Sequence, residues 1–210
     1  MSKTGVMICG HGSRDEEAVA EFQSLARGMC ERLPQYDVES GFLEFAQPTI
    51  QEGLEKLVKR GVTEILAVPA MLFAAGHVKN DIPWELNSFV ASHPNVSLSC
   101  GRDLSIEPKL LMAARDRIAT AMGATGDGVA VADTLLMVVG RGTNDPDANS
   151  NISKVSRMLW EGLDLGWAEA CYSGVAYPRV DAGLERVAAM SFRRIIVFPY
   201  FLFTGVLVKR

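Results

Sequence analysis

The chain repeats itself, and this repeat constrains its fold more than any other feature. Moving the sequence by 130 residues places residues 6–80 on residues 136–210 without a gap, with 20 identities in 75 positions. A repeat of this length is too long for a solenoid unit and matches a duplicated domain. The shared residues are mostly glycine, proline and apolar types, among them the pairs Gly10/Gly140, Gly12/Gly142, Pro48/Pro178 and Pro69/Pro199. We therefore expect the two copies to share one architecture.

Both copies alternate between strand-like apolar stretches and helix-like amphipathic stretches. The expected strands are 5–10, 38–45, 63–73, 96–101, 135–140, 167–176 and 193–203, and the expected helices are 15–33, 48–60, 81–93, 106–122, 146–163 and 179–190. Strict alternation of this kind is typical of a mainly parallel sheet with helices on both faces. The sequence therefore predicts an α/β fold made of two repeated domains, each a mainly parallel sheet flanked by helices.

The two copies differ in length. The first continues beyond residue 80 through a helix, a strand and a second helix, whereas the second stops at Arg210, so the counterpart of residues 81–125 is missing. We interpret residues 1–125 as an N-terminal half and residues 131–210 as a C-terminal half that looks truncated. A small-residue linker over 123–133 joins them. The chain could be a fragment, or it could end here naturally.

Composition excludes several classes of protein. The net charge of −4 argues against a general nucleic-acid binder, and no run of 18 apolar residues indicates a membrane span. The sequence MSKTGVMICGHGS enters a strand pattern at once, so we expect no signal peptide. The four cysteines, Cys9, Cys30, Cys100 and Cys171, form no CxxC pair. We expect reduced, buried cysteines in a cytoplasmic protein.

Three residues of the first copy that could bind a metal or move protons have no such counterpart in the second copy. His11 aligns with Arg141, Glu44 with Gly174 and His77 with Leu207. Each of the three lies at or just after the end of an expected strand, although Glu44 also falls inside the apolar run 38–45. Ligands of parallel sheets bind beyond the carboxyl ends of the strands, so the three side chains can share one site.

Two imidazoles and one carboxylate suit a first-row divalent cation with open coordination positions, and the same groups can accept protons from a substrate. Taken singly, each residue has a plainer interpretation: a histidine that caps a strand end, or a carboxylate on a solvent-facing strand. A phosphohistidine role for His11 is disfavoured because Gly10 stands where histidine phosphatases have arginine. His93 precedes a proline, and we interpret it as an ordinary surface residue.

Three segments carry a resemblance to a known family: GHGSRDEEA, FLEFAQPTIQEGLEKLVKRG and VPAMLFAAGHVKNDIP. Together they resemble the class II tetrapyrrole chelatases, and within these the sirohydrochlorin cobaltochelatases in their long form with two fused halves. The resemblance covers nearly the whole chain. It implies two α/β domains related by a pseudo-twofold axis with a cleft between them, no organic cofactor, and metal binding and delivery by His11, Glu44 and His77. Gln47 departs from the acidic residue usual in this region.

On this interpretation the chain inserts Co²⁺ into sirohydrochlorin for cobalamin synthesis, and releases two pyrrole protons. His11 binds the metal and accepts a proton, His77 assists, and Glu44 offsets charge and shares in proton transfer. The flat macrocycle needs apolar walls and its carboxylates need cations. The candidate walls are Met7, Leu43, Phe45, Met71 and Phe73, and the candidate cations are Arg14, Lys79 and Arg141.

Two alternatives stay open. A ferrochelatase that makes sirohaem would use the same residues, because imidazole and carboxylate ligands accept Co²⁺, Ni²⁺ and Fe²⁺ alike. A carrier that binds metal or tetrapyrrole without catalysis would need neither a proton acceptor nor an open coordination position. No GxxxxGK[ST] phosphate loop occurs, so no residue pattern calls for ATP.

Overall fold

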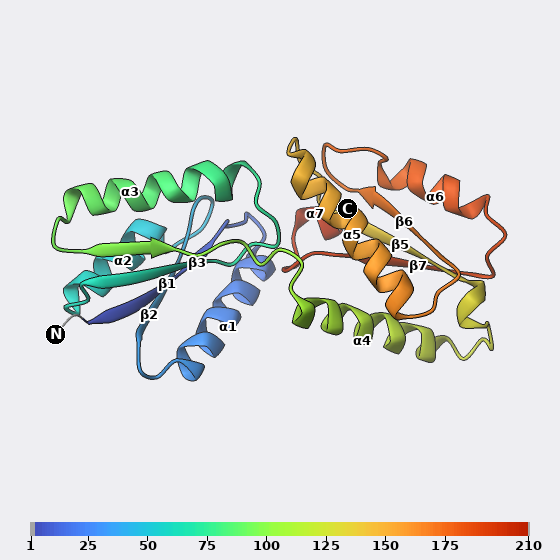
Figure 1. Ribbon diagram of the computed structural model, residues 1–210, viewed down its shortest axis with the longest axis horizontal. Coiled ribbons are helices and arrows are strands. Elements are labelled where there is room, and N and C mark those ends of the chain that lie inside the picture. The colour runs from blue at the N-terminus through green and yellow to red at the C-terminus, as the bar shows by residue number, and fades with distance from the viewer. Residues whose placement is uncertain (1–2, 210) are drawn as a thin grey trace. The chain divides into compact units, whose positions relative to one another are not determined.

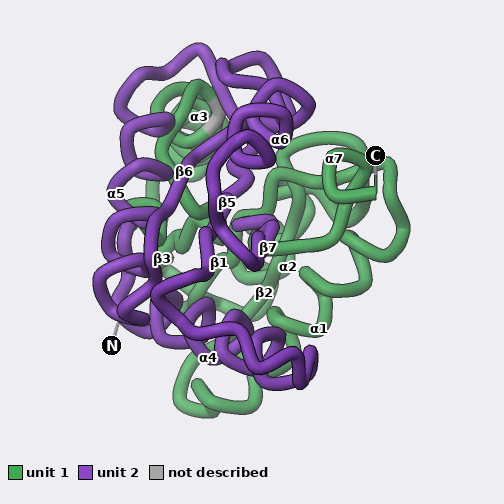
Figure 2. The backbone as a smooth tube through the Cα atoms, turned by 90° about the vertical axis from the view of Figure 1, so that its right-hand side faces the viewer, with its two compact units in different colours: residues 1–105, 202–210 green, residues 106–201 purple. Residues whose placement is uncertain are grey.

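The computed structural model describes residues 3–209, apart from the side chain of His77. The chain divides into two compact units, residues 1–105 with 202–210 and residues 106–201 (Figure 2). Each is an α/β unit built on a parallel sheet, which confirms the predicted fold class (Figure 1). The unit boundaries differ from the repeat boundaries, since residues 106–125 belong to the second unit and residues 202–210 to the first.

The first unit contains a four-stranded parallel sheet in the order β2-β1-β3-β4. Its strands are β1 (Thr4–Gly10), β2 (Asp37–Phe42), β3 (Glu64–Pro69) and β4 (Ser97–Cys100). Its helices are α1 (Glu16–Arg32), α2 (Ile50–Lys59), the π-helical turn η1 (His77–Asp81), α3 (Ile82–Ser92) and, from the end of the chain, α7 (Val206–Lys209).

Two apolar clusters hold the first unit together, one on each face of the sheet. Successive side chains of a strand point to opposite faces. Val6 and Ile8 of β1 therefore pack with Phe22 of α1, while Met7 and Cys9 pack with the cluster that contains the apolar sides of α2 and α3. Both faces of β1 are buried, which explains why this central strand is a continuous apolar run.

Capping side chains define the starts of α1 and α2. Asp15 caps α1, and its carboxylate accepts a hydrogen bond from the Glu17 amide. Thr49 and Glu52 form a reciprocal capping box at the start of α2. Such caps satisfy backbone N–H groups that have no partner inside the helix. They fix where the loops after β1 and β2 end, and these loops carry His11 and Glu44.

The second unit contains a three-stranded parallel sheet in the order β6-β5-β7. Its elements are α4 (Pro108–Thr125), the 3₁₀ turn η2 (Val131–Asp133), β5 (Thr134–Gly140), α5 (Pro146–Gly162), β6 (Trp167–Tyr172), α6 (Val180–Ala188) and β7 (Arg194–Pro199). The register repeats that of the first unit. Gly5 pairs with Asp37 in the first sheet, and the residues 130 positions later, Leu135 and Trp167, pair in the second sheet. The prediction that the two copies share strand order is confirmed.

One face of the second sheet is more exposed than its counterpart. Ile65 of β3 and Leu54 of α2 are completely buried, but Ile195 of β7 is 36% exposed and Leu184 of α6 is 41% exposed. In the first unit α3 and β4 lie on this side of β3, and β4 pairs with it. Within the described part of the second unit, β7 pairs only with β5. The same sequence positions therefore contribute unequally to the two cores.

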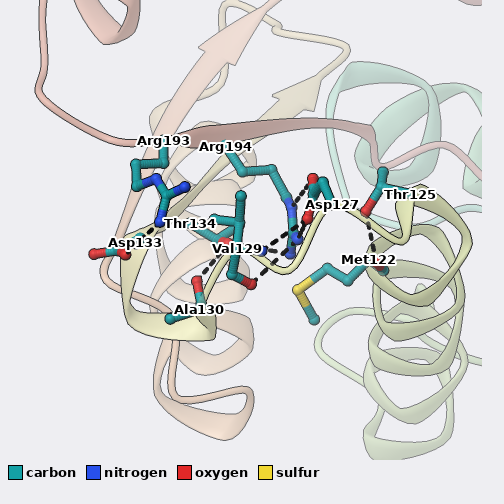
Figure 3. A network of polar contacts seen from close by, with 9 residues as sticks. All are labelled: Met122, Thr125, Asp127, Val129, Ala130, Asp133, Thr134, Arg193 and Arg194. Atoms are coloured by element: carbon teal, nitrogen blue, oxygen red, sulfur yellow. Dashed lines mark hydrogen bonds and ion pairs between the residues drawn. The ribbon is translucent and has the colours of Figure 1, made fainter.

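A polar network ties the segment after α4 to β7 (Figure 3). The Arg194 guanidinium donates to both carboxylate oxygens of Asp127, one of them 3.1 Å from Nε, and to the Val129 carbonyl at 3.2 Å. The Arg194 side chain is only 10% exposed. This arginine holds the pKa of Asp127 down at about 2. The predicted linker over 123–133 is thus fastened to the sheet, and α4 extends through Thr125.

Some expected element lengths were wrong. β2 ends at Phe42 and β3 at Pro69, so the apolar runs 38–45 and 63–73 continue past the ends of their strands. Phe45 has a φ of 64°, which no strand residue adopts. None of the described helices has the length and apolar character needed to span a bilayer.

Candidate active site

The site is built where three parallel strands of the first unit end side by side. In the β2-β1-β3 arrangement, Gly10 pairs with Phe42 and Cys9 with Pro69. The loops after β1, β2 and β3 therefore leave the sheet at the same edge. They carry His11, Glu44 and the segment leading to His77, so the strand order brings together regions that are far apart in sequence.

The loops after β1 and β2 are joined through their backbones. The amide of Leu43 donates to the Gly10 carbonyl at 2.9 Å, and the amide of Glu44 donates to the His11 carbonyl at 3.0 Å. Gly12 has a φ of 95°, and a Cβ placed there would lie 1.7 Å from the Glu44 carbonyl oxygen. Only glycine permits this approach. Glu44 lies in this loop and not inside a strand, which corrects the alternative placement in the run 38–45.

The imidazole of His11 lies beside the carboxylate of Glu44. The distance from Nε2 to Oε1 is 3.4 Å, and the side chains are 22% and 36% exposed. His11 Nδ1 is 3.0 Å from the Gly12 carbonyl oxygen, which can only accept a hydrogen bond. Nδ1 must therefore carry a proton, so neutral His11 has its lone pair on Nε2, on the side of Glu44.

This arrangement can hold either a proton or a metal ion. An imidazole lone pair and a carboxylate oxygen both attract a cation, and neither can donate to the other. When His11 is protonated the two groups form an ion pair. When it is neutral they offer one nitrogen and one oxygen ligand to a first-row divalent metal. Binding of a metal here would release the proton, because imidazole must be neutral to coordinate.

His77 is the first residue of the π-helical turn η1, just beyond the loop that follows β3. That loop is fixed by the segment after β4: Asp103 accepts from the Ala74 amide at 3.0 Å, and the Leu104 amide donates to the Met71 carbonyl at 2.9 Å. The side chain of His77 lies outside the described part of the structure. The described side chains alone contain no cluster of three His, Cys, Asp or Glu that could hold a metal ion. Convergence of all three predicted ligands thus stays a prediction.

The predicted substrate-binding residues differ in exposure. Phe45 is 53% exposed, and the Arg14 guanidinium lies 4.9 Å from the centre of its ring. This contact joins an apolar surface to a positive charge within one loop cluster. Phe73 is partly buried and Lys79 is exposed. Leu43 and Met71 pack partly against the core. Met7 is completely buried, so its candidacy as a wall was wrong, because its strand is covered on both faces.

The second copy lacks the donor groups at the equivalent positions. Arg141 is exposed after β5, and a Cβ placed at Gly174 would lie 2.3 Å from the Arg141 carbonyl oxygen. Leu207 lies in α7, which belongs to the first unit. Guanidinium, hydrogen and isobutyl groups offer no lone pair for a metal. The backbone frame is therefore repeated, while the donors His11 and Glu44 occur in the first copy alone.

Sequence reasoning missed that Phe22 of α1 packs beneath the strand ends that carry the site. Phe22 is 2% exposed, its ring lies 4.6 Å from that of Phe42, and a Cβ at Gly10 would come within 2.6 Å of it. The sequence signal for this contact was a large residue at position 22 together with a glycine at position 10, which leaves room for it. Those positions could not be matched without knowing the helix packing.

Other expectations need adjustment. His93 is partly buried, with its ring stacked at 4.0 Å on Phe89 and Nδ1 3.0 Å from the Phe89 carbonyl oxygen, so it completes the end of α3.

All four cysteines are free thiols, but only Cys9 and Cys171 are buried. Burial raises the pKa of the Cys9 thiol and raises that of Cys171 to about 11. Cys30 and Cys100 are exposed, which corrects the prediction of four buried thiols.

Comparison with known proteins identifies the family. The CbiX family model matches residues 5–121 and 135–210. The chain belongs to the CbiX family. A sirohydrochlorin cobaltochelatase from Priestia megaterium is 35% identical over 208 residues, which are 98% of this chain and 66% of that protein. A sirohydrochlorin ferrochelatase from Bacillus subtilis (strain 168) is 30% identical over 210 residues, which are 99% of this chain and 77% of the relative.

A solved structure agrees with this assignment. SirB from Bacillus subtilis with Fe³⁺ matches with a TM-score of 0.88 and 28% identity, over 99% of this chain and 80% of the SirB chain. The resemblance to the class II chelatases is therefore confirmed. This CbiX-family chain spans just under two thirds of the length of the Priestia megaterium cobaltochelatase. Its relatives include both cobalt and iron chelatases, so the family alone does not select the metal.

Proposed function

We propose that this protein is a sirohydrochlorin chelatase, a metal-inserting enzyme of the lyase class. The observation that carries the proposal is the His11–Glu44 pair, with Nε2 and Oε1 3.4 Å apart at the carboxyl ends of β1 and β2. Metal insertion needs a site that binds a divalent cation and accepts the protons that leave the pyrrole nitrogens. A neutral imidazole beside a carboxylate supplies both functions, and no organic cofactor takes part.

The proposed steps use the donors in turn. His11 Nε2 and Glu44 bind the incoming metal ion, with His77 as a third ligand from the loop after β3. As the metal passes to the macrocycle, two pyrrole protons leave. His11 accepts one, Glu44 stabilises the imidazolium that results and takes part in removing the second, and both protons pass on to solvent. The Nδ1–H of His11, held by the Gly12 carbonyl, fixes the ring orientation through both states. Turnover should fall at acidic pH, because protonated imidazole has no lone pair to offer.

The proposed substrate surface consists of one exposed aromatic ring and several cations. Phe45 with Arg14 above its ring offers a flat apolar face next to a positive charge, which suits a tetrapyrrole bearing carboxylates. Met71, Phe73 and Lys79 of the loop after β3 and the following turn are further candidates. Arg141 would hold a substrate carboxylate. We propose that the protein acts in the cytoplasm, because its cysteines are free thiols and free thiols are typical of reducing compartments. We propose no nucleic-acid partner.

We propose Co²⁺ as the metal, inserted for cobalamin synthesis. The cobaltochelatase from Priestia megaterium is 35% identical, against 30% for the ferrochelatase from Bacillus subtilis and 29% for that from Priestia megaterium. Ferrochelatase action in sirohaem synthesis is the second candidate, since those iron enzymes match over nearly the whole chain. A SirB structure in complex with cobalt also matches, with a TM-score of 0.82.

The test is an absorbance assay of the purified chain with metal-free sirohydrochlorin and Co²⁺, Fe²⁺ or Ni²⁺ in turn. The proposal predicts metal insertion well above the uncatalysed rate, and a higher initial rate with Co²⁺ than with Fe²⁺. A higher rate with Fe²⁺ would identify a ferrochelatase. Binding of sirohydrochlorin without any acceleration would mean that the chain is a carrier.

A further inference from the structure

The loops that carry His11 and Glu44 rest on one aromatic side chain of α1. Phe22 is buried against the last residues of both strands: its ring contacts that of Phe42 at 4.6 Å, and it leaves no room for a Cβ at Gly10. Gly10 immediately precedes His11, and Phe42 lies two residues before Glu44. The position of α1 over the sheet therefore sets the position of both strand ends.

The last described residues of the chain bind the first two turns of α1. The ring of Phe203 meets that of Phe22 edge-on, with 5.9 Å between centres. Thr204 donates twice to the Glu21 carboxylate, from its amide at 2.5 Å and from Oγ1 at 2.7 Å. Lys209 Nζ lies 2.8 Å from a carboxylate oxygen of Asp15 and of Glu17. All of these contacts lie within the first unit.

The second copy holds its equivalent loop in a different way. Thr143 and Asn149 exchange two hydrogen bonds, from the Thr143 amide at 2.9 Å and to the Thr143 carbonyl at 2.7 Å. Tyr172 adds a hydrogen bond from its hydroxyl to the Asn149 carbonyl at 3.0 Å. The counterparts of Asn149 and Tyr172 are Val19 and Phe42, whose side chains contain no polar atom. The first copy therefore cannot make this clamp.

We infer that residues 203–209 act as a brace on α1 that positions His11 and Glu44 for the proposed reaction. Thr204 and Lys209 bind three carboxylates, one at the N-cap of α1 and two on its first two turns, and Phe203 contacts the aromatic ring that supports both strand ends. Residues 203–209 of the second copy thus support the first copy in place of the clamp that Val19 and Phe42 cannot form. Thr204 and Lys209 are positioning residues, since their contacts among the described residues are with carboxylates of α1 and its N-cap and not with His11 or Glu44. This inference rests on the proposed function.

The test compares Thr204→Val, which loses the hydroxyl donor, with Thr204→Ser, which keeps it. Hydrogen exchange of the Leu43 and Glu44 amides reports directly on the loops after β1 and β2, because these amides donate to the carbonyl oxygens of Gly10 and His11. We expect both amides to exchange about tenfold faster in Thr204→Val, the change expected for loss of one hydrogen bond to a charged group. In Thr204→Val, the Ile8 amide in the centre of the sheet should exchange at the wild-type rate. In Thr204→Ser, the Leu43 and Glu44 amides should also exchange at the wild-type rate.

The matched control is Thr120→Val, which removes a hydroxyl that donates to the Asp116 carbonyl within α4. It should leave Leu43 and Glu44 unchanged. A second variant, Lys209→Met, should accelerate the same two amides, whereas Lys154→Met, on an exposed position of α5, should not. Unchanged loop amides in both brace variants, or equal acceleration at Ile8, would overturn the inference.

Steady-state kinetics with sirohydrochlorin and Co²⁺ supply the functional arm. In Thr204→Val we expect kcat to fall about tenfold while KM stays within about twofold, because the brace orients the donors and does not bind substrate. Thr204→Ser should restore kcat. A rise in KM alone would contradict a positioning role. If the wild type itself shows no insertion, the proposed function fails, and the exchange measurements still decide whether the brace exists.

Discussion

His11 differs from its counterpart Arg141 in the property that metal insertion requires, which is a nitrogen lone pair. The sequence predicted that His11 and Glu44 would be neighbours, because parallel strands present their carboxyl ends at one edge. It could not predict which imidazole nitrogen carries the lone pair. That follows from the Gly12 carbonyl oxygen, which lies 3.0 Å from Nδ1 in a loop where Gly12 has a φ of 95°.

Gly12→Ala tests this geometry at the scale of one atom. The new Cβ would lie 1.7 Å from the Glu44 carbonyl oxygen, so the two loops must separate. We expect the free energy of unfolding to fall by about 1–3 kcal/mol, from strain at positive φ, and metal insertion to fall at least tenfold by a rough estimate. Thermal unfolding and initial rates are the measurements.

The control for this prediction is Gly142→Ala in the second copy. Gly142 also has a positive φ, and its added Cβ would come within 2.9 Å of Tyr172 Cβ. It should lose stability to a similar extent and keep most of its kcat. If Gly142→Ala were as inactive as Gly12→Ala, loss of activity would reflect strain in general rather than separation of the donors.

Among the elements, equivalent helices and strands of the two copies are buried to different extents. The sequence predicted their order and register, because the apolar spacing is the same in both copies. It overestimated β2, since the run FLEF remains apolar beyond Phe42 while Phe45 leaves the extended conformation. It also could not show that Ile65 is buried and Ile195 exposed, because burial depends on α3 and β4, which lie elsewhere in the chain.

Leu54→Ala and Leu184→Ala measure this inequality. Leu54 is completely buried between α2 and the first sheet, so its truncation should cost about 2–5 kcal/mol of unfolding free energy. Leu184 occupies the equivalent position of α6 but is 41% exposed, and its truncation should cost under about 1 kcal/mol. Urea denaturation of both variants measures these losses. Equal losses of unfolding free energy would mean that the exposed side of α6 is covered in solution.

The Asp127–Arg194 contact predicts a pH dependence of stability. Arg194 lowers the pKa of Asp127 from 3.8 to about 2 in the folded chain. A lowered folded-state pKa stabilises the fold at pH values above 3.8, and this contribution is lost as the pH falls through about 2. Asp127→Asn should therefore unfold at a lower temperature than the wild type near neutral pH, with the difference shrinking as acid is added.

Thermal unfolding of both proteins between neutral pH and about pH 2 checks this expectation, and Asp116→Asn, an exposed carboxylate on α4, is the control. A difference between Asp127→Asn and wild type that does not change with pH would contradict the assignment of the low pKa to the Arg194 contact.

For the whole molecule, the repeat explains how one half could acquire chemistry without changing the fold. The two copies share strand order and register, so the backbone frame is common, while the donors His11 and Glu44 belong to the first copy. The sequence predicted this division. It could not predict that residues 202–210 group with the first unit, because their contacts with α1 leave no mark in the periodicity of either copy.

The most direct test of the account is a comparison of His11→Ala and Arg141→Ala in steady-state kinetics with sirohydrochlorin and Co²⁺. Alanine at position 11 offers no lone pair to a metal or a proton, so kcat should fall to near the uncatalysed rate. Arginine has no lone pair to lose, so Arg141→Ala should mainly raise KM through the loss of one contact to a substrate carboxylate. An inactive Arg141→Ala beside a His11→Ala variant near wild type would show that the chemistry lies in the other half.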